Sequence, residues 1–93
     1  MRVQNAFEPA IWNYDIETLR KLIKLEFNNK TLKSVRVSTE KMDLIWLSLN
    51  DGVIVEETTV PTGKYIEKKV IPVYRMDDRE RIIAYATIWY DNS

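Results

Sequence analysis

The tripeptide Asn50-Asp51-Gly52 is the feature that most constrains the fold of this chain. It separates two segments, residues 42–49 and 53–60, that are rich in β-branched, aliphatic and aromatic side chains. Asn, Asp and Gly tolerate the left-handed backbone conformations that a tight hairpin needs. The sequence therefore predicts a β-hairpin at this point, with Gly52 at positive φ.

Two loop lengths are compatible with this turn, and they place different residues opposite one another. A three-residue loop of residues 50–52 pairs Leu49 with Val53 and Leu47 with Val55. A two-residue loop of residues 51–52 pairs Leu47 with Glu56 instead. A slip of one residue moves a strand's apolar side chains to the opposite face of the sheet. We therefore expect the three-residue loop, because it pairs apolar residues with one another. This loop also places Gly52 in a bulge.

The segment before the hairpin contains one predicted helix. Residues 1–14 are interrupted by Pro9 and contain several aromatic side chains, which favours an irregular arm that docks through its aromatic rings. Asp15 is a good N-cap residue and predicts a helix over residues 15–28. Apolar residues at helical spacing give this helix one buried face, formed by Ile16, Leu19, Ile23 and Phe27.

The remainder of the chain predicts five β-strands. Their expected ranges are 32–38, 42–49, 53–60, 65–76 and 81–90. Imperfect alternation favours an edge position for the first strand, and apolar residues on both faces favour an interior position for the second. Pro72 lies inside the fourth strand, which therefore needs a bulge or a free edge there.

These elements predict a single α+β domain over residues 1–93, with an arm (1–14), one amphipathic helix (15–28) and an antiparallel β-meander (32–90). We expect the helix to lie over Ala84 and Ala86 of the last strand, because small residues permit a close approach. The order of elements resembles that of cystatin-like folds, by topological analogy only. The Gln-Val-Val-Ala-Gly loop of cysteine-protease inhibitors is absent, so the resemblance implies no inhibitory residues.

The composition removes most catalytic chemistry. The chain has no histidine, no cysteine and two glycines, so it lacks the commonest general base, thiolate ligands and phosphate-cradling loops. Glu56 and Glu57 are adjacent on a strand and point to opposite faces. Asp77, Asp78 and Glu80 lie together in a predicted turn. They could hold a hard cation weakly, but we expect an ordinary solvated turn. We expect no catalytic residues, no metal and no cofactor.

Charge gives a weaker functional indication. Fourteen basic residues balance fourteen acidic ones, which argues against bulk attraction to nucleic acid or membranes. No apolar run is long enough to span a bilayer and no signal-peptide pattern is present, so we expect a cytoplasmic protein. Basic residues do gather around the predicted helix and offer possible phosphate contacts at Arg20, Lys21, Lys24, Lys30 and Lys33.

Aromatic content gives the stronger indication. One helix covers only one face of a sheet, so the face carrying Ile83, Tyr85 and Trp89 needs another cover. Three covers are possible: the arm around Trp12, a second copy of the chain, or a different protein. The sequence thus predicts a non-enzymatic protein-binding module, homodimeric or in a hetero-complex. In size and composition it resembles small phage or mobile-element inhibitors of host defence proteins and immunity-type proteins. Nucleic-acid binding through the basic helix and a small-ligand pocket between helix and sheet are the alternatives.

Overall fold

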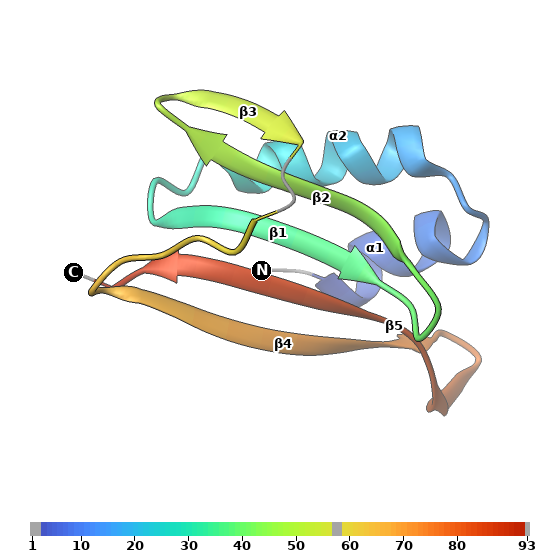
Figure 1. Ribbon diagram of the computed structural model, residues 1–93. Coiled ribbons are helices and arrows are strands. Elements are labelled where there is room, and N and C mark those ends of the chain that lie inside the picture. The colour runs from blue at the N-terminus through green and yellow to red at the C-terminus, as the bar shows by residue number, and fades with distance from the viewer. Residues whose placement is uncertain (1–2, 57–58, 93) are drawn as a thin grey trace.

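The computed structural model describes residues 3–56 and 59–92. It confirms the α+β class, with two helices on a five-stranded antiparallel sheet (Figure 1). The elements are α1 (Val3–Trp12), α2 (Ile16–Glu26), β1 (Leu32–Ser38), β2 (Asp43–Asn50), β3 (Val53–Glu56), β4 (Ile66–Arg75) and β5 (Asp78–Asp91).

The strand order is β3-β2-β1-β5-β4, so the predicted meander is wrong. The last strand, β5, lies between β1 and β4, and β1 is the central strand rather than an edge. The polar residues that suggested an edge have partners: the Ser34 hydroxyl bonds to Ser48, and the Arg36 side chain lies over two tryptophan rings. The interior position of β2 is confirmed, and β4 is an edge strand, where Pro72 is tolerated.

The hairpin forms as predicted, but its register is the alternative one. Asn50 pairs with Val53 and Leu47 pairs with Glu56, which leaves a two-residue loop. Asp51 and Gly52 have φ values of 50° and 80°, the combination of a type I′ turn, whose twist matches that of the flanking strands. Positive φ at Gly52 is confirmed. The strand β3 ends at Glu56, short of the predicted Val60, and residues 57 and 58 (Glu57 among them) lie outside the described residues.

The predicted irregular arm is a helix. In α1, Phe7, Ala10 and Ile11 are buried and follow helical spacing, so that this apolar face outweighs the cost of Pro9 inside the helix. The Pro9 carbonyl is satisfied by the backbone N–H of Asn13 at 3.1 Å and by the Asn13 side-chain amide at 2.9 Å.

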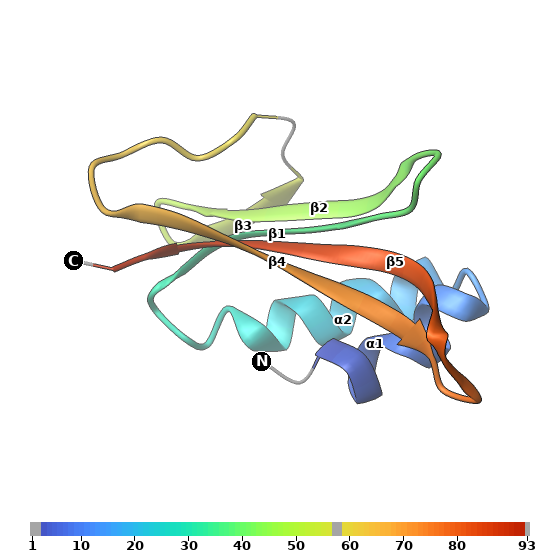
Figure 2. The ribbon, with the colours of Figure 1, turned by 90° about the horizontal axis from the view of Figure 1, so that it is seen from below.

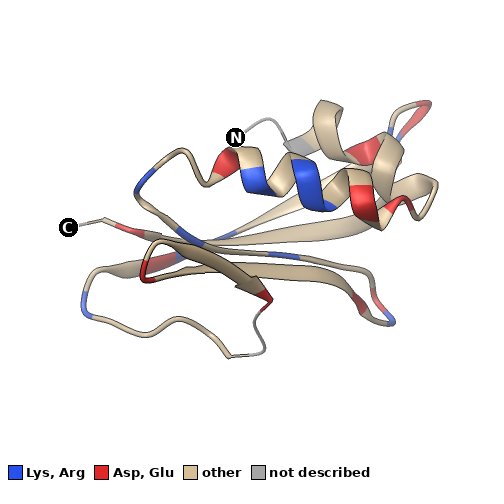
Figure 3. Ribbon diagram, turned by 90° about the horizontal axis from the view of Figure 1, so that it is seen from above, with Lys and Arg blue, Asp and Glu red and all other residues tan. Residues whose placement is uncertain are grey.

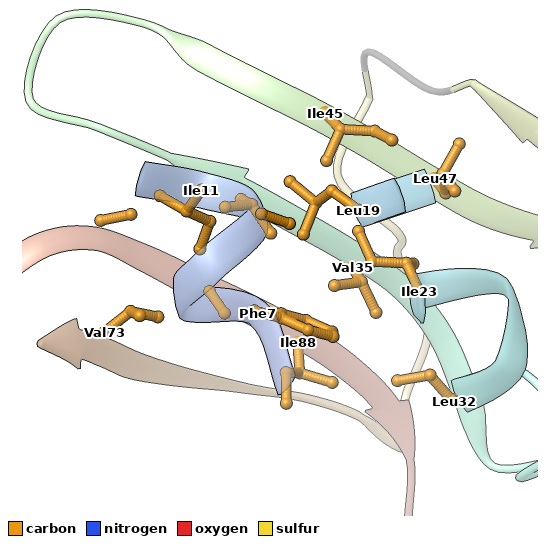
Figure 4. Close-up of a cluster of buried hydrophobic side chains, with 14 of the residues drawn as sticks. Phe7, Ile11, Leu19, Ile23, Leu32, Val35, Ile45, Leu47, Val73 and Ile88 are labelled. Atoms are coloured by element: carbon orange, nitrogen blue, oxygen red, sulfur yellow. The ribbon is translucent and has the colours of Figure 1, made fainter. Parts of the chain in front are cut away.

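Helix α2 begins after Asp15, whose carboxylate accepts the backbone N–H of Thr18, as predicted for an N-cap. Both helices cover the same face of the sheet (Figure 2). Ala84 and Ala86 are buried, but the helix lying against β4 and β5 is α1, while α2 lies against β2. Figure 4 shows Phe7 of α1 beside Ile88, and Leu19 of α2 towards β2.

Candidate functional site

A groove of about 460 Å³ opens at one end of the molecule. Its walls are the carboxyl end of α1, the turn between β1 and β2, and the first part of β5, three segments that lie together at the right-hand end of Figure 1. Trp12 and Ile83, two of the predicted interface residues, both line it. So do Tyr14 and Ile82, whose exposed fractions are 64% and 42%. The groove therefore presents large apolar side chains to solvent.

Tyr14 occupies a backbone position that favours glycine. Its φ is 53°, and it follows α1 in a Schellman motif: the N–H of Tyr14 donates to the Ile11 carbonyl and that of Asp15 to the Ala10 carbonyl. A bulky residue in this left-handed conformation is strained by about 1 kcal/mol or more. The ring is exposed, so burial of its apolar surface offsets little of this strain. The strain is of the kind that is tolerated at functional sites.

Asp15, the next residue, joins the two helices. Its carboxylate accepts hydrogen bonds from the hydroxyl and the backbone N–H of Thr18, which lower the pKa of Asp15 below its ordinary value. This cap fixes the start of α2 at Ile16. Sequence reasoning placed the cap correctly, but it did not identify Tyr14 as a groove residue, because the helix preceding it was missed.

Two guanidinium groups lie over the Trp12 ring. The Arg75 guanidinium carbon is 3.9 Å from the indole centroid and that of Arg81 is 5.1 Å away. Both contacts are cation–π interactions, and they fix the ring while leaving the side chain 38% exposed. Tryptophan, tyrosine and arginine are the residue types that contribute most to binding energy at protein interfaces. Neither arginine was recognised from the sequence.

Helix α1 is anchored behind the groove by two polar side chains. Glu8 is 1% exposed; its carboxylate bonds to Arg75 at 3.0 Å and accepts the backbone N–H of Met76 at 2.6 Å. One turn earlier, the Gln4 amide donates to the Tyr74 carbonyl and accepts the Tyr74 N–H. Gln4 thereby pairs with edge strand β4 as another strand would. These contacts fix α1, which carries Trp12, against the end of β4, which carries Arg75.

The other two predicted interface residues lie elsewhere. Tyr85 and Trp89 belong to the sheet face opposite the helices (Figure 2). Because α1 lies on the other face, the arm, one of the three expected covers, does not cover them. Trp89 is 3% exposed within this single chain. It stacks on Trp46 with 5.5 Å between ring centroids, and Arg36 lies over both rings. Trp89 is therefore covered by its own chain, whereas Tyr85 remains half-buried.

A hydrogen-bond network fixes this second aromatic cluster. The Trp46 indole N–H donates to the Ser34 hydroxyl at 2.6 Å, and the hydroxyls of Ser34 and Ser48 are 2.7 Å apart. Both serines are buried. Trp46, Trp89 and Arg36 with these serines form what we call the seam cluster, since its members come from β2, β1 and β5. The indole N–H and the two hydroxyls are thus bonded within the cluster, while the buried Nε of Arg36 has no hydrogen-bond partner among the described residues. The bonded groups suit a structural role.

The basic residues predicted as phosphate contacts do not form a uniform surface. Arg20 bonds to Glu56 at 2.6 Å and pairs also with Glu17, and the bond to Glu56 is the main reason that the pKa of Arg20 is raised. Along α2 the basic residues lie between two acidic ones, Glu17 near the start of the helix and Glu26 at its end (Figure 3). Lys21, Lys24 and Lys30 are exposed, whereas Lys33 is half-buried on β1.

Two further expectations concern small ligands. A shallow pocket of about 270 Å³ lies between the end of α2 and the sheet, over an apolar floor of Leu32, Ile71 and Ile88. In the predicted acidic turn, Asp77 pairs with Arg75 at 3.5 Å and Asp78 accepts the backbone N–H of Glu80. Within residues 3–56 and 59–92, no group of three or more acidic residues is arranged to hold a metal ion.

Among the same residues, neither helix has the length and apolar character required to cross a bilayer. Comparison of the chain with protein-family models, with curated proteins and with solved structures found no match.

Proposed function

We propose that this protein is a non-enzymatic protein-binding module and that the groove around Trp12 is its binding surface. The observation that carries the proposal is Tyr14, an exposed aromatic side chain held at φ 53° on the rim of the groove. Glycine at this position would remove the backbone strain. A contact made by the tyrosine ring with a partner gives a reason for the strained residue.

The neighbouring side chains fit the same role. Trp12 is positioned by Arg75 and Arg81 and remains partly exposed, and the exposed Ile82 lies on the same groove. An anchor that is already fixed in its bound orientation loses little conformational entropy on binding. An inhibitor, an adaptor and an immunity-type protein would all use such a surface, and a second copy of the chain is the homodimeric form of the same proposal.

A capture experiment with matched variants tests the proposal. The wild type, Trp12→Ala, Tyr14→Gly and Tyr65→Ala are immobilised in parallel and exposed to extract of the native cell. Tyr65 is a control because it is a tyrosine of similar exposure that does not line the groove. We expect a protein that is retained by the wild type and Tyr65→Ala and lost from both groove variants.

Sedimentation of the four purified proteins covers self-association. If the wild type and Tyr65→Ala are dimers and both groove variants are monomers, the partner is a second copy. A wild type that captures the same proteins as the two groove variants, and sediments as they do, would contradict the proposal. Circular dichroism spectra of all four proteins establish that each variant is folded.

A further inference from the structure

Among the described residues, Arg81 has no carboxylate partner, and in this it differs from Arg75, the other arginine over Trp12. Arg75 is bonded to Glu8 and paired with Asp77, so its charge is already neutralised within the fold. Within the part of the chain that the structure describes, no carboxylate lies within 4.0 Å of the Arg81 guanidinium, which lies over the Trp12 ring. An arginine held over an aromatic ring still presents its N–H groups at the edge of the plane.

The charges that line the groove are two cations and one anion. Arg81 and Lys41 are the cations, and Glu40 is the anion. Glu40 is exposed and is not within ion-pair distance of Arg81. The groove thus combines exposed apolar side chains with an excess of one positive charge and a guanidinium available to bind an anion. This combination is complementary to a ligand that carries carboxylates next to apolar side chains.

We infer that the groove binds an acidic, apolar peptide segment of its partner, with a partner carboxylate on Arg81 and a neighbouring apolar side chain against Trp12. This inference deepens the proposed function and depends on it. Arginine binds carboxylates through two parallel N–H···O bonds. The cation–π contact with Trp12 holds the guanidinium plane in place, so that little side-chain entropy is lost when the carboxylate binds.

Three synthetic peptides test the charge of the ligand. Each is acetylated and amidated, and leucine alternates with glutamate in the first, with glutamine in the second and with lysine in the third. Titration calorimetry measures their affinity for the wild-type protein. We expect the glutamate peptide to bind about tenfold or more tightly than the glutamine peptide, since charge-assisted hydrogen bonds are worth more than neutral ones.

Substitutions in the groove then assign the effect to its residues. Arg81→Gln should abolish the preference for glutamate, and Arg81→Lys should retain part of it, because lysine keeps the charge without the planar fork. Glu40→Gln should strengthen binding of the glutamate peptide, by about threefold for an exposed charge. Arg79→Gln is the matched control: it makes the same change in charge at an exposed arginine that does not line the groove.

The outcomes separate this inference from the proposed function. Equal binding of the three peptides, a preference for the lysine peptide, or weaker glutamate binding by Glu40→Gln would overturn the acidic ligand. Binding of a thymidine oligonucleotide that Arg81→Gln abolishes would overturn it in favour of phosphate. If no peptide binds but capture of a protein still depends on Trp12 and Tyr14, the acidic segment is wrong and the protein-binding function stands.

Discussion

The molecule contains two tryptophan–arginine clusters that differ in how far their tryptophan rings are exposed to solvent. In the seam cluster, Arg36 lies over Trp46 and Trp89, the Ser34 hydroxyl accepts the indole N–H of Trp46, and Trp89 is almost fully buried. At the groove, Arg75 and Arg81 lie over Trp12, which is exposed. The same residue types thus stabilise the sheet in one place and present a surface in the other. Composition alone does not distinguish these roles; burial and hydrogen bonding do.

The most direct way to break this comparison is to truncate one tryptophan from each cluster. Trp89→Ala should lower the free energy of unfolding by about 3–5 kcal/mol, because it removes a buried ring and leaves a cavity. Trp12→Ala should lower it by about 1 kcal/mol, because the ring is partly exposed and its loss removes mainly the contacts with two arginines. Urea unfolding measures both. Similar losses for the two variants would show that the clusters are equivalent.

The second expected effect concerns the support behind the groove. Arg75→Ala leaves the Glu8 carboxylate buried without its ion pair and should cost about 3 kcal/mol. Adding Glu8→Gln to this variant should recover part of the loss, since the buried charge is then absent. Arg79→Ala, at an exposed arginine nearby, should stay within about 0.5 kcal/mol of the wild type. Equal unfolding midpoints for the two arginine variants would exclude a supporting role for the Glu8–Arg75 pair.

A third, smaller effect sharpens the difference in hydrogen bonding. Ser34→Ala removes the acceptor of the Trp46 indole and a partner of the Ser48 hydroxyl, so it should cost about 2 kcal/mol. Ser38→Ala, on the same strand and on the same face, is the control and should change stability by about 0.5 kcal/mol or less. Urea unfolding of the two serine variants measures the difference in their free energies of unfolding. If the two values are equal, the hydrogen-bond network does not stabilise the seam cluster.

The smallest effect has the opposite sign. Tyr14→Gly should raise the free energy of unfolding by up to about 1 kcal/mol, because glycine relieves the left-handed strain but increases the entropy of the unfolded chain. Asp51→Gly also replaces a residue at positive φ and should gain less, since Asp tolerates this conformation better. A destabilised Tyr14→Gly protein would mean that the ring packs in the fold and would remove the reason for assigning it to binding.

Local patterns in the sequence predicted the local elements well. The Asp15 cap, the apolar face of α2, five antiparallel strands and positive φ at Gly52 are all confirmed. Each is determined by a few adjacent residues whose backbone preferences and periodicity agree. The predicted hairpin register is wrong because, in this hairpin, the type I′ turn geometry outweighs the pairing of apolar residues. Glu56, opposite Leu47, lies on the edge strand β3 and has Arg20 of α2 as its partner.

Features that depend on distant residues could not be predicted in this way. Pro9 argues against a helix in this segment, although the spacing of Phe7, Ala10 and Ile11 is that of one buried helix face and indicates α1. Without α1, nothing in the sequence brought Trp12 together with Arg75 and Arg81. The place of β1 depended on partners for Ser34 and Arg36 that come from other strands. The strand order and the groove therefore emerge from the tertiary structure.

The insertion of β5 beside β1 has a consequence for how the chain folds. Short turns join β1, β2 and β3, and another joins β4 and β5, so each group can form quickly by itself. Their union requires Val35 to meet Ile88, a separation of more than half the chain. Such non-local pairing slows folding, and until it occurs β1 has an exposed edge. Trp46 and Trp89 lie on opposite sides of this join. Their stacking therefore gives a fluorescence signal for the step at which the two groups dock.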